Sequence, residues 1–320
     1  MTVSARTIRV GTRASLLART QTELVVRSFS AIHQDLPVET VLVSTHGDRS
    51  AAPLDQLGGT GVFVSALRDA LLAGEIDVAV HSYKDLPTAS VPEIALAAVP
   101  RREDPRDALV ARDAMTLLEL PSGARVGTGS PRRGAQLRAL DLGLELVPIR
   151  GNVDTRLARV GDDLDAVVLA AAGLHRLGRN DVITELLDPI LVLPAAAQGA
   201  LAIECRADDA ELCSLLACLD DNPSRVAVAA ERSLLAALEA GCTAPVGALA
   251  EVVESGDDLA VSDPSGGLEI FLRGSVTAID GSDALRLSAS GPLNTAEDVG
   301  RRLAAELLEL GATTMMGSSK

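Results

Sequence analysis

Arginine and serine side chains occur where strand-like runs of this chain end and helical patterns begin. Three such turns are present, at Gly11–Ser15, Gly127–Arg133 and Ile149–Arg156. A helix N-terminus offers unpaired backbone N–H groups and the positive end of the helix dipole, which together bind carboxylates or phosphates. Arg13 and Ser15 add side-chain donors to the first turn. The pattern predicts anion sites, and the alternative is ordinary turns with serine caps.

The second turn has the clearest helix start. Ser130 can cap the helix, and Pro131 suits the first helical position because its missing N–H is no loss there. Arg132 and Arg133 then lie in the first turn, where the helix dipole disfavours cations. Two adjacent arginines at that position favour an anion site, with a solvated basic turn as the alternative.

The arginines of the second and third turns belong to a basic stretch of an acidic chain. Residues 125–159 contain seven arginines and three acidic residues, whereas the whole chain has a net charge of −15. The planar guanidinium fork suits bidentate pairing with carboxylates. The contrast therefore favours a site for a polyanion, and a salt-bridged surface is the alternative.

A cation and a carboxylate stand side by side in His81–Pro87. This segment follows a predicted strand at 77–80, and ligands of open α/β sheets bind at the carboxyl ends of strands. Next to Lys84, Asp85 can hold a cationic intermediate or move protons. The alternative is a surface turn with a salt bridge, and His81 is interpreted as a hydrogen-bonded structural histidine.

The cysteines differ in their sequence surroundings. Cys242 follows a helical pattern and a glycine, so we expect it in a loop, where a thiol is more reactive than in a core. The surroundings of Cys242 are compatible with three interpretations: a nucleophile, an attachment point, or a residue without a chemical role. Cys205, Cys213 and Cys218 lie in apolar patterns typical of packing residues. No cysteine or histidine has metal-ligand spacing, so we expect neither a metal site nor disulfides.

Alternating β-branched runs and helical patterns predict the elements that position these residues. The alternation through residue 204 favours an α/β fold with mostly parallel sheets. Strands at 268–276 and 284–290, followed by a helix at 295–310, indicate a small α+β part. Breaks near residues 100, 197 and 220 divide the chain into three predicted domains. These are 1–100 with about 198–219, then 106–197, and then 220–320.

Composition narrows the classes of function. The net charge of −15 argues against a nucleic-acid binder, which needs a basic face. There is no apolar leader at the N-terminus and no apolar run long enough for a bilayer, so we expect a cytoplasmic protein without a membrane partner. Aromatic residues are 1% of the chain, and a core of Leu, Val, Ile and Ala follows.

Nine segments, in order, resemble the porphobilinogen deaminase (hydroxymethylbilane synthase) family over about residues 6–250. They are TRAS at 12–15, STHGD at 44–48, HSYKDLPT at 81–88, REDPRDA at 102–108, GTGSPRR at 127–133, RGNVDTR at 150–156, AAGLHRLG at 171–178, LPAAAQGALAIECR at 193–206, and the segment from AER to GC at 230–242. One such match is weak, but nine in the family's order are specific.

The resemblance implies a transferase of tetrapyrrole (haem) biosynthesis. It would condense four porphobilinogen molecules into hydroxymethylbilane and release ammonia. The product would grow on a dipyrromethane cofactor, held by a thioether to the cysteine that Cys242 matches. The implied fold has two α/β domains like periplasmic-binding-protein lobes, with a cleft between them, and a small α+β domain carrying the cysteine. We expect a monomer.

The resemblance also assigns residue roles. Asp85 matches the catalytic aspartate, which would stabilise the positive charge left when ammonia departs. The substrate's carboxylates would be bound by Arg13, Ser15, Arg150, Arg156 and Arg176. The cofactor would be held by Cys242, Lys84, Ser130, Arg132 and Arg133.

Two positions depart from the family pattern. Pro131 replaces a leucine, which is benign at a first helical position. Thr60 replaces a lysine that the family often has in its glycine-rich loop, which questions an anion contact from that loop. Two other interpretations stay open: a two-lobed anion-binding protein without catalysis, and a cysteine-nucleophile transferase without a bound cofactor.

Overall fold

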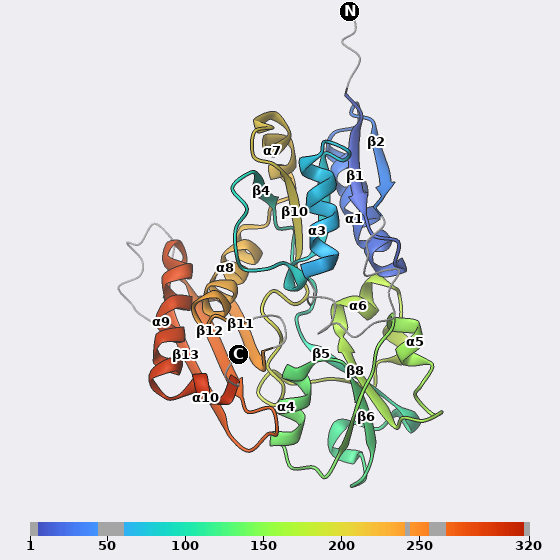
Figure 1. Cartoon of the computed structure of the whole chain (residues 1–320), viewed down its shortest axis with the longest axis vertical. Helices are drawn as coiled ribbons and strands as arrows, with labels where there is room; N and C mark the ends of the chain where they lie inside the picture. Colours follow the sequence, from blue (N-terminus) through green and yellow to red (C-terminus); the bar gives the residue numbers. More distant parts are fainter. Residues whose placement is uncertain (1–5, 44–60, 241–243, 256–266, 317–320) are drawn as a thin grey trace, which may run out of the picture. The chain divides into compact units, whose positions relative to one another are not determined.

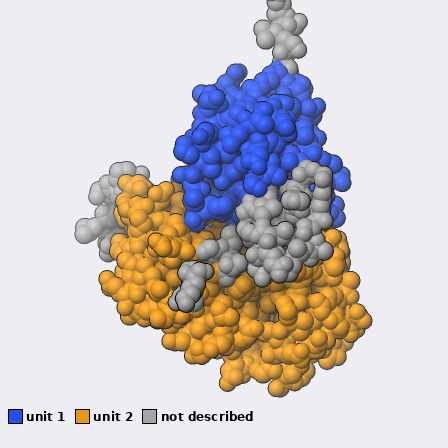
Figure 2. Space-filling view, viewed as in Figure 1, with its two compact units in different colours: residues 1–102, 200–225 blue, residues 103–199, 226–320 orange. Residues whose placement is uncertain are grey.

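The computed structural model describes residues 6–43, 61–240, 244–255 and 267–316. The chain forms two compact units, coloured separately in Figure 2. Unit 1 consists of residues 1–102 and 200–225, and unit 2 of residues 103–199 and 226–320. Because residues 226–320 share a unit with 103–199, the division into three domains stays a prediction.

Unit 1 contains a five-stranded sheet whose order is β2-β1-β3-β10-β4. Its elements are β1 (Ile8–Thr12), α1 (Leu16–Ile32), β2 (Val38–Leu42), α3 (Gly61–Leu72), β3 (Val78–Ser82), the 3-10 turn η1 (Tyr83–Asp85), β4 (Ile94–Ala98), β10 (Leu201–Arg206) and α7 (Ala210–Leu216). β1 pairs in parallel with β2 and β3, whereas β10 is antiparallel to β3 and β4. α1 and α7 bury a hydrophobic core against this sheet, including Val25, Phe29 and Leu212.

Unit 2 contains a second five-stranded sheet, in the order β7-β6-β8-β5-β9. Its elements are β5 (Asp107–Ala111), β6 (Arg125–Thr128), α4 (Pro131–Ala139), β7 (Glu145–Pro148), α5 (Val153–Leu157), β8 (Ala166–Ala170), α6 (Ala171–Arg176) and β9 (Glu185–Leu186). β6 is parallel to β7 and β8, and β5 is antiparallel to β8 and β9.

The two sheets share one topology. In each sheet three parallel strands lie side by side, and the first of the three in chain order lies between the other two. The fourth strand across the sheet is antiparallel to its parallel neighbour, and the fifth strand forms the edge. The antiparallel strand is in each case the first strand after the chain changes units, β5 on entering unit 2 and β10 on returning to unit 1. The α/β fold class predicted for this part of the chain is therefore confirmed.

The C-terminal part of unit 2 forms an antiparallel three-stranded sheet with its own core. Its elements are α8 (Asn222–Ala237, of which residues 226–237 belong to unit 2), β11 (Val246–Glu254), β12 (Leu268–Thr277), β13 (Ala284–Pro292), α9 (Ala296–Glu309) and α10 (Ala312–Met316). α9 packs on β12 and β13 through its apolar stripe, in which Leu303 and Leu307 are fully buried. This is the small α+β part that the sequence predicted. The Thr295 hydroxyl, however, donates to the Pro292 carbonyl instead of capping α9.

None of the helices in the described part of the chain combines the length and the apolar character that a bilayer crossing requires.

Candidate active site

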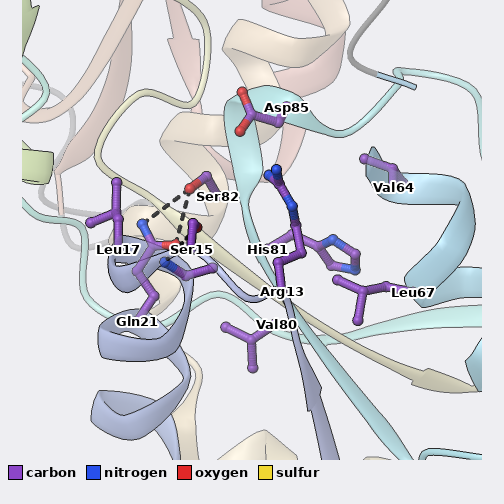
Figure 3. A pocket seen from close by; sticks show the side chains of 11 residues that line it. Arg13, Ser15, Leu17, Gln21, Val64, Leu67, Val80, His81, Ser82 and Asp85 are labelled. Carbon is purple, nitrogen blue, oxygen red and sulfur yellow. Dashed lines mark hydrogen bonds between the residues drawn. The ribbon is translucent and has the colours of Figure 1, made fainter. Parts of the chain in front are cut away.

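A pocket in unit 1 brings together residues from the ends of β1 and β3 and from the start of α1. It is lined by Arg13, Ser15, Leu17, Ala18, Gln21, Val64, Leu67, Val80, His81, Ser82 and Asp85. Figure 3 shows these side chains around one hollow, with Asp85 on η1 just beyond β3. Sequence reasoning expected ligands at strand ends, and three of its candidate residues line this pocket.

Helix α1 begins at this pocket. Ser15 is its N-cap, and its hydroxyl accepts a hydrogen bond of 3.3 Å from the backbone N–H of Ala18. One turn further, the Gln21 side chain pairs with the Ser82 hydroxyl at 3.0 and 3.1 Å, which ties α1 to the end of β3. The helix start is thus both a cap and one wall of the pocket.

A buried ion pair lies behind the pocket. Glu204 on β10 is 4% exposed and accepts two hydrogen bonds from Arg68 on α3, at 3.0 and 2.6 Å. Its Oε2 also lies 3.3 Å from Nε2 of His81, a pocket residue. Burial alone raises a carboxyl pKa. Here the neighbouring His81 ring and the hydrogen bonds from Arg68 outweigh it and lower the pKa of Glu204 to about 2.

Arg132 and Arg133 of unit 2 lie in a buried ion cluster around Asp107. Arg132 donates to Asp107 at 2.8 Å, and Arg133 donates twice to the other carboxylate oxygen, at 2.9 and 2.8 Å. All three residues are at most 5% exposed. The paired guanidinium groups hold the pKa of Asp107 below its usual range against the opposing effect of burial. Ser130 caps α4 as predicted, accepting from the Arg133 backbone N–H.

Arg150 and Arg156 form a second kind of arginine site in unit 2. Arg150 is exposed and Arg156 partly buried, and among the described residues neither has a carboxylate partner. The pKa of Arg156 is lowered, first by burial and then by the positive charges of Arg133 and Arg150. Like charges gathered without a counter-ion favour an anionic ligand.

Arg176 and Lys84 complete the predicted set inside the described residues. Arg176 at the end of α6 is partly buried and donates to the Gly199 carbonyl at 2.6 Å, and burial lowers its pKa. Lys84 is partly buried on η1 and does not line the pocket. Cys242 and Thr60 lie outside the described residues.

The sequence analysis missed two residues beside these sites. Asp107 falls in REDPRDA, a segment matched without a role, and Glu204 falls in LPAAAQGALAIECR. An acidic residue inside or at the edge of an apolar run was the available signal, because buried carboxylates need partners. His81 was assigned to structure, yet it lines the pocket.

Two family models match most of the chain. The model of the dipyrromethane cofactor binding domain of porphobilinogen deaminase matches residues 8–214, and the model of the C-terminal domain matches residues 226–309. This chain belongs to the porphobilinogen deaminase family. The cofactor that the sequence resemblance implied is thereby supported, and the anion-binding alternative without catalysis is not favoured.

Curated porphobilinogen deaminases are similar along their whole length. The Nocardia farcinica protein is 60% identical, covering 97% of this chain and 88% of its own. The protein of Mycobacterium tuberculosis strain H37Rv is 58% identical, covering 97% and 98%. Solved structures are more distant. The Bordetella pertussis BvgS VFT2 domain is 17% identical with a TM-score of 0.40, covering 66% of this chain and 85% of its own.

Glu204 makes folding of unit 1 sensitive to acid. Its pKa is about 2 in the folded protein against an ordinary value of 4.5. A lowered pKa gives a stabilisation that is complete above the unfolded value and is lost as the pH falls toward the folded one. We expect Glu204→Gln to lower the free energy of unfolding by about 3 kcal/mol at neutral pH, and by progressively less between about pH 5 and pH 3.

Urea denaturation across this pH range measures the difference between the wild-type protein and the variant. Glu75→Gln changes an exposed glutamate of the same unit and serves as the matched control, with no pH-dependent difference expected. A destabilisation by Glu204→Gln that stayed constant down to about pH 3 would contradict the assignment.

Proposed function

We propose that this chain condenses four porphobilinogen molecules into hydroxymethylbilane with release of ammonia, using the unit 1 pocket as its reaction site. The observation that carries the proposal is the pocket itself, in which Asp85 lies with the carboxylate-binding groups Arg13 and Ser15. Each substrate pyrrole bears acetate and propionate side chains, so a cation and a helix start are suitable binding groups.

Asp85 supplies the charge that the reaction needs. Departure of the amino group takes the C–N bonding electrons with it and leaves positive charge on the pyrrole and its methylene carbon. A carboxylate held beside the pyrrole stabilises this charge in the transition state more than in the ground state, which is the condition for acceleration. Asp85 is partly buried, and exclusion of water strengthens the interaction.

The arginines of unit 2 fit a polyanionic dipyrromethane. Arg150 and Arg156 gather positive charge that no described carboxylate offsets. Arg176 joins them in binding the carboxylates of the growing product. When bound, the dipyrromethane supplies the covalent anchor and the pyrrole carbon to which the first substrate is joined. Cys242 is the residue that we assign to the thioether.

Lys84, Ser130, Arg132 and Arg133 are assigned to holding the cofactor. Arg132 and Arg133 direct several of their N–H groups at Asp107, so only their remaining donors are open to a ligand. The Arg132 Nε has no acceptor among the described residues, and the atom is itself buried. We further assign the chain to the cytoplasm, as a monomer without nucleic-acid or membrane partners, because its charge is strongly acidic.

Asp85→Asn separates charge stabilisation from folding. The variant keeps the size and shape of the side chain but loses its charge. We expect kcat for porphobilinogen consumption to fall at least about 100-fold, with an unchanged thermal midpoint. Asp208→Asn, at an exposed position of the same unit, is the control and should keep the wild-type rate. Near-normal turnover by Asp85→Asn would remove Asp85 from the mechanism.

Two neighbouring arginines distinguish ligand binding from surface charge. Arg156 has no carboxylate partner among the described residues, whereas Arg159 is paired with Asp163. We expect Arg156→Ala to lower kcat/KM about 10- to 100-fold, the loss of one charge-assisted contact. Arg159→Ala should stay within about threefold of wild type. Steady-state kinetics with porphobilinogen measure both, and equal losses in the two variants would contradict a specific role for Arg156.

A further inference from the structure

The reaction pocket holds two side chains that are able to accept a proton, those of His81 and Asp85. Among its lining residues only Arg13, His81 and Asp85 are ionisable. Arginine stays protonated in proteins and cannot act as a base. Asp85 must remain an anion while it stabilises positive charge, so a proton released at that stage is better accepted by another group. His81 is the lining residue that remains.

His81 is placed by sheet register against Glu204. β3 and β10 are antiparallel, with His81 opposite Ala202 and Ala79 opposite Glu204. His81 and Glu204 are therefore diagonal neighbours on one face of the sheet. The His81 Nε2 lies 3.3 Å from the Glu204 Oε2. Arg68 donates two hydrogen bonds to the same carboxylate, so the Glu204 oxygen beside His81 has a fixed position.

The His81 ring is buried but incompletely satisfied. The residue is 6% exposed, and its Nε2, which lies 3.3 Å from the Glu204 Oε2, forms no hydrogen bond with any described residue. A buried polar group without a hydrogen-bond partner destabilises the folded state, which is unexpected for a purely structural histidine. Catalytic hydrogen bonds are often poorly aligned without ligand and tighten when the substrate binds.

We propose that His81 is a second catalytic residue, the base that accepts the proton lost by the pyrrole ring, with Glu204 and Arg68 as positioning residues. The inference rests on the proposed function and adds a proton acceptor to it. Glu204 stabilises the imidazolium that forms, as a carboxylate does for a catalytic histidine in other enzymes.

The proposed step balances in atoms and charge. The C–N bond to the protonated amino group of the substrate breaks, and nitrogen leaves with the bonding electrons as ammonia. A C–C bond forms to the unsubstituted carbon of the accepting pyrrole, which then loses its hydrogen as a proton. His81 takes that proton and passes it to ammonia or solvent, returning to the neutral ring. No oxidant or reductant is involved.

The charges around His81 are compatible with both of its protonation states. The groups of its network and of the pocket are Glu204 from β10, Arg68 from α3, Arg13 after β1 and Asp85 from η1. Two carboxylates and two guanidinium groups balance one another. These groups therefore bring no excess charge of either sign to the surroundings of the imidazole.

Single-turnover and steady-state kinetics of His81→Gln over pH test the proposal in the cofactor-loaded enzyme. We expect kcat to fall about 100-fold, and the decline of kcat on the acid side of the wild-type profile to disappear. His33→Gln is the matched control, since His33 ends α1 with its ring against the Leu215 carbonyl. It should keep both the rate and the pH profile.

Glu204→Gln tests positioning separately. It should lower kcat while the acid-side decline of kcat persists at a changed pH, because His81 remains but loses its charged neighbour.

Should His81→Gln fail to fold, His81→Asn and Glu204→Gln decide the question by the same profiles. A folded His81 variant with kcat within about threefold of wild type and an unchanged profile overturns the proposal. If that variant is normal while Asp85→Asn is inactive, only this inference fails. If the wild-type protein releases no ammonia from porphobilinogen, the proposed function fails.

Discussion

The sheet part of unit 2 depends on the ion cluster around the buried carboxylate of Asp107. This carboxylate is fully buried and accepts from Arg132, Arg133 and Gln198. Removing one member of such a cluster leaves a buried charge without a partner, which destabilises the protein by about 3–5 kcal/mol. The same arginines bond to the carbonyls of Leu193 and Val168, so the cluster joins β5, the start of α4, β8 and the segment before Gly199.

This cluster divides the arginines of an acidic chain into two groups with different electrostatics. Arg132 and Arg133 share one internal carboxylate and are nearly inaccessible. Arg150 and Arg156 have no such partner among the described residues, and burial together with repulsion from Arg133 and Arg150 lowers the pKa of Arg156. An anionic ligand would relieve that repulsion, and a pyrrole with two carboxylates has the complementary charge. The protein thus keeps a strongly negative net charge and still offers a local positive site.

Local chemistry made part of this structure predictable. The caps Ser15 and Ser130 lie where the sequence put them, because a cap depends only on residues within one turn. Strand β5 is hard to recognise in the sequence, since its apolar run of four residues after Asp107 fits a buried strand or a helix segment equally well. Helix α5 ends at Leu157, and the chain then turns through Gly161, which has a positive φ.

Long-range pairing was beyond sequence reasoning. No residue near His81 in the chain predicts its contact with Glu204, and none near Arg132 predicts the ion pair with Asp107. Only strand register and helix packing bring these partners together. The interpretation of His81 as merely structural depended on its immediate neighbours, and its position in the pocket argues for more. The role of Cys242 rests on the family motif and stays a prediction, because it lies outside the described residues.

The intact mass of the denatured protein, before and after incubation with porphobilinogen, tests the central claim most directly. We expect the wild-type mass to exceed the sequence mass by one dipyrromethane, with further pyrrole-sized steps after substrate, and Cys242→Ser to carry no adduct. An active wild-type protein whose mass equals that of its sequence, and does not change with substrate, would contradict the account.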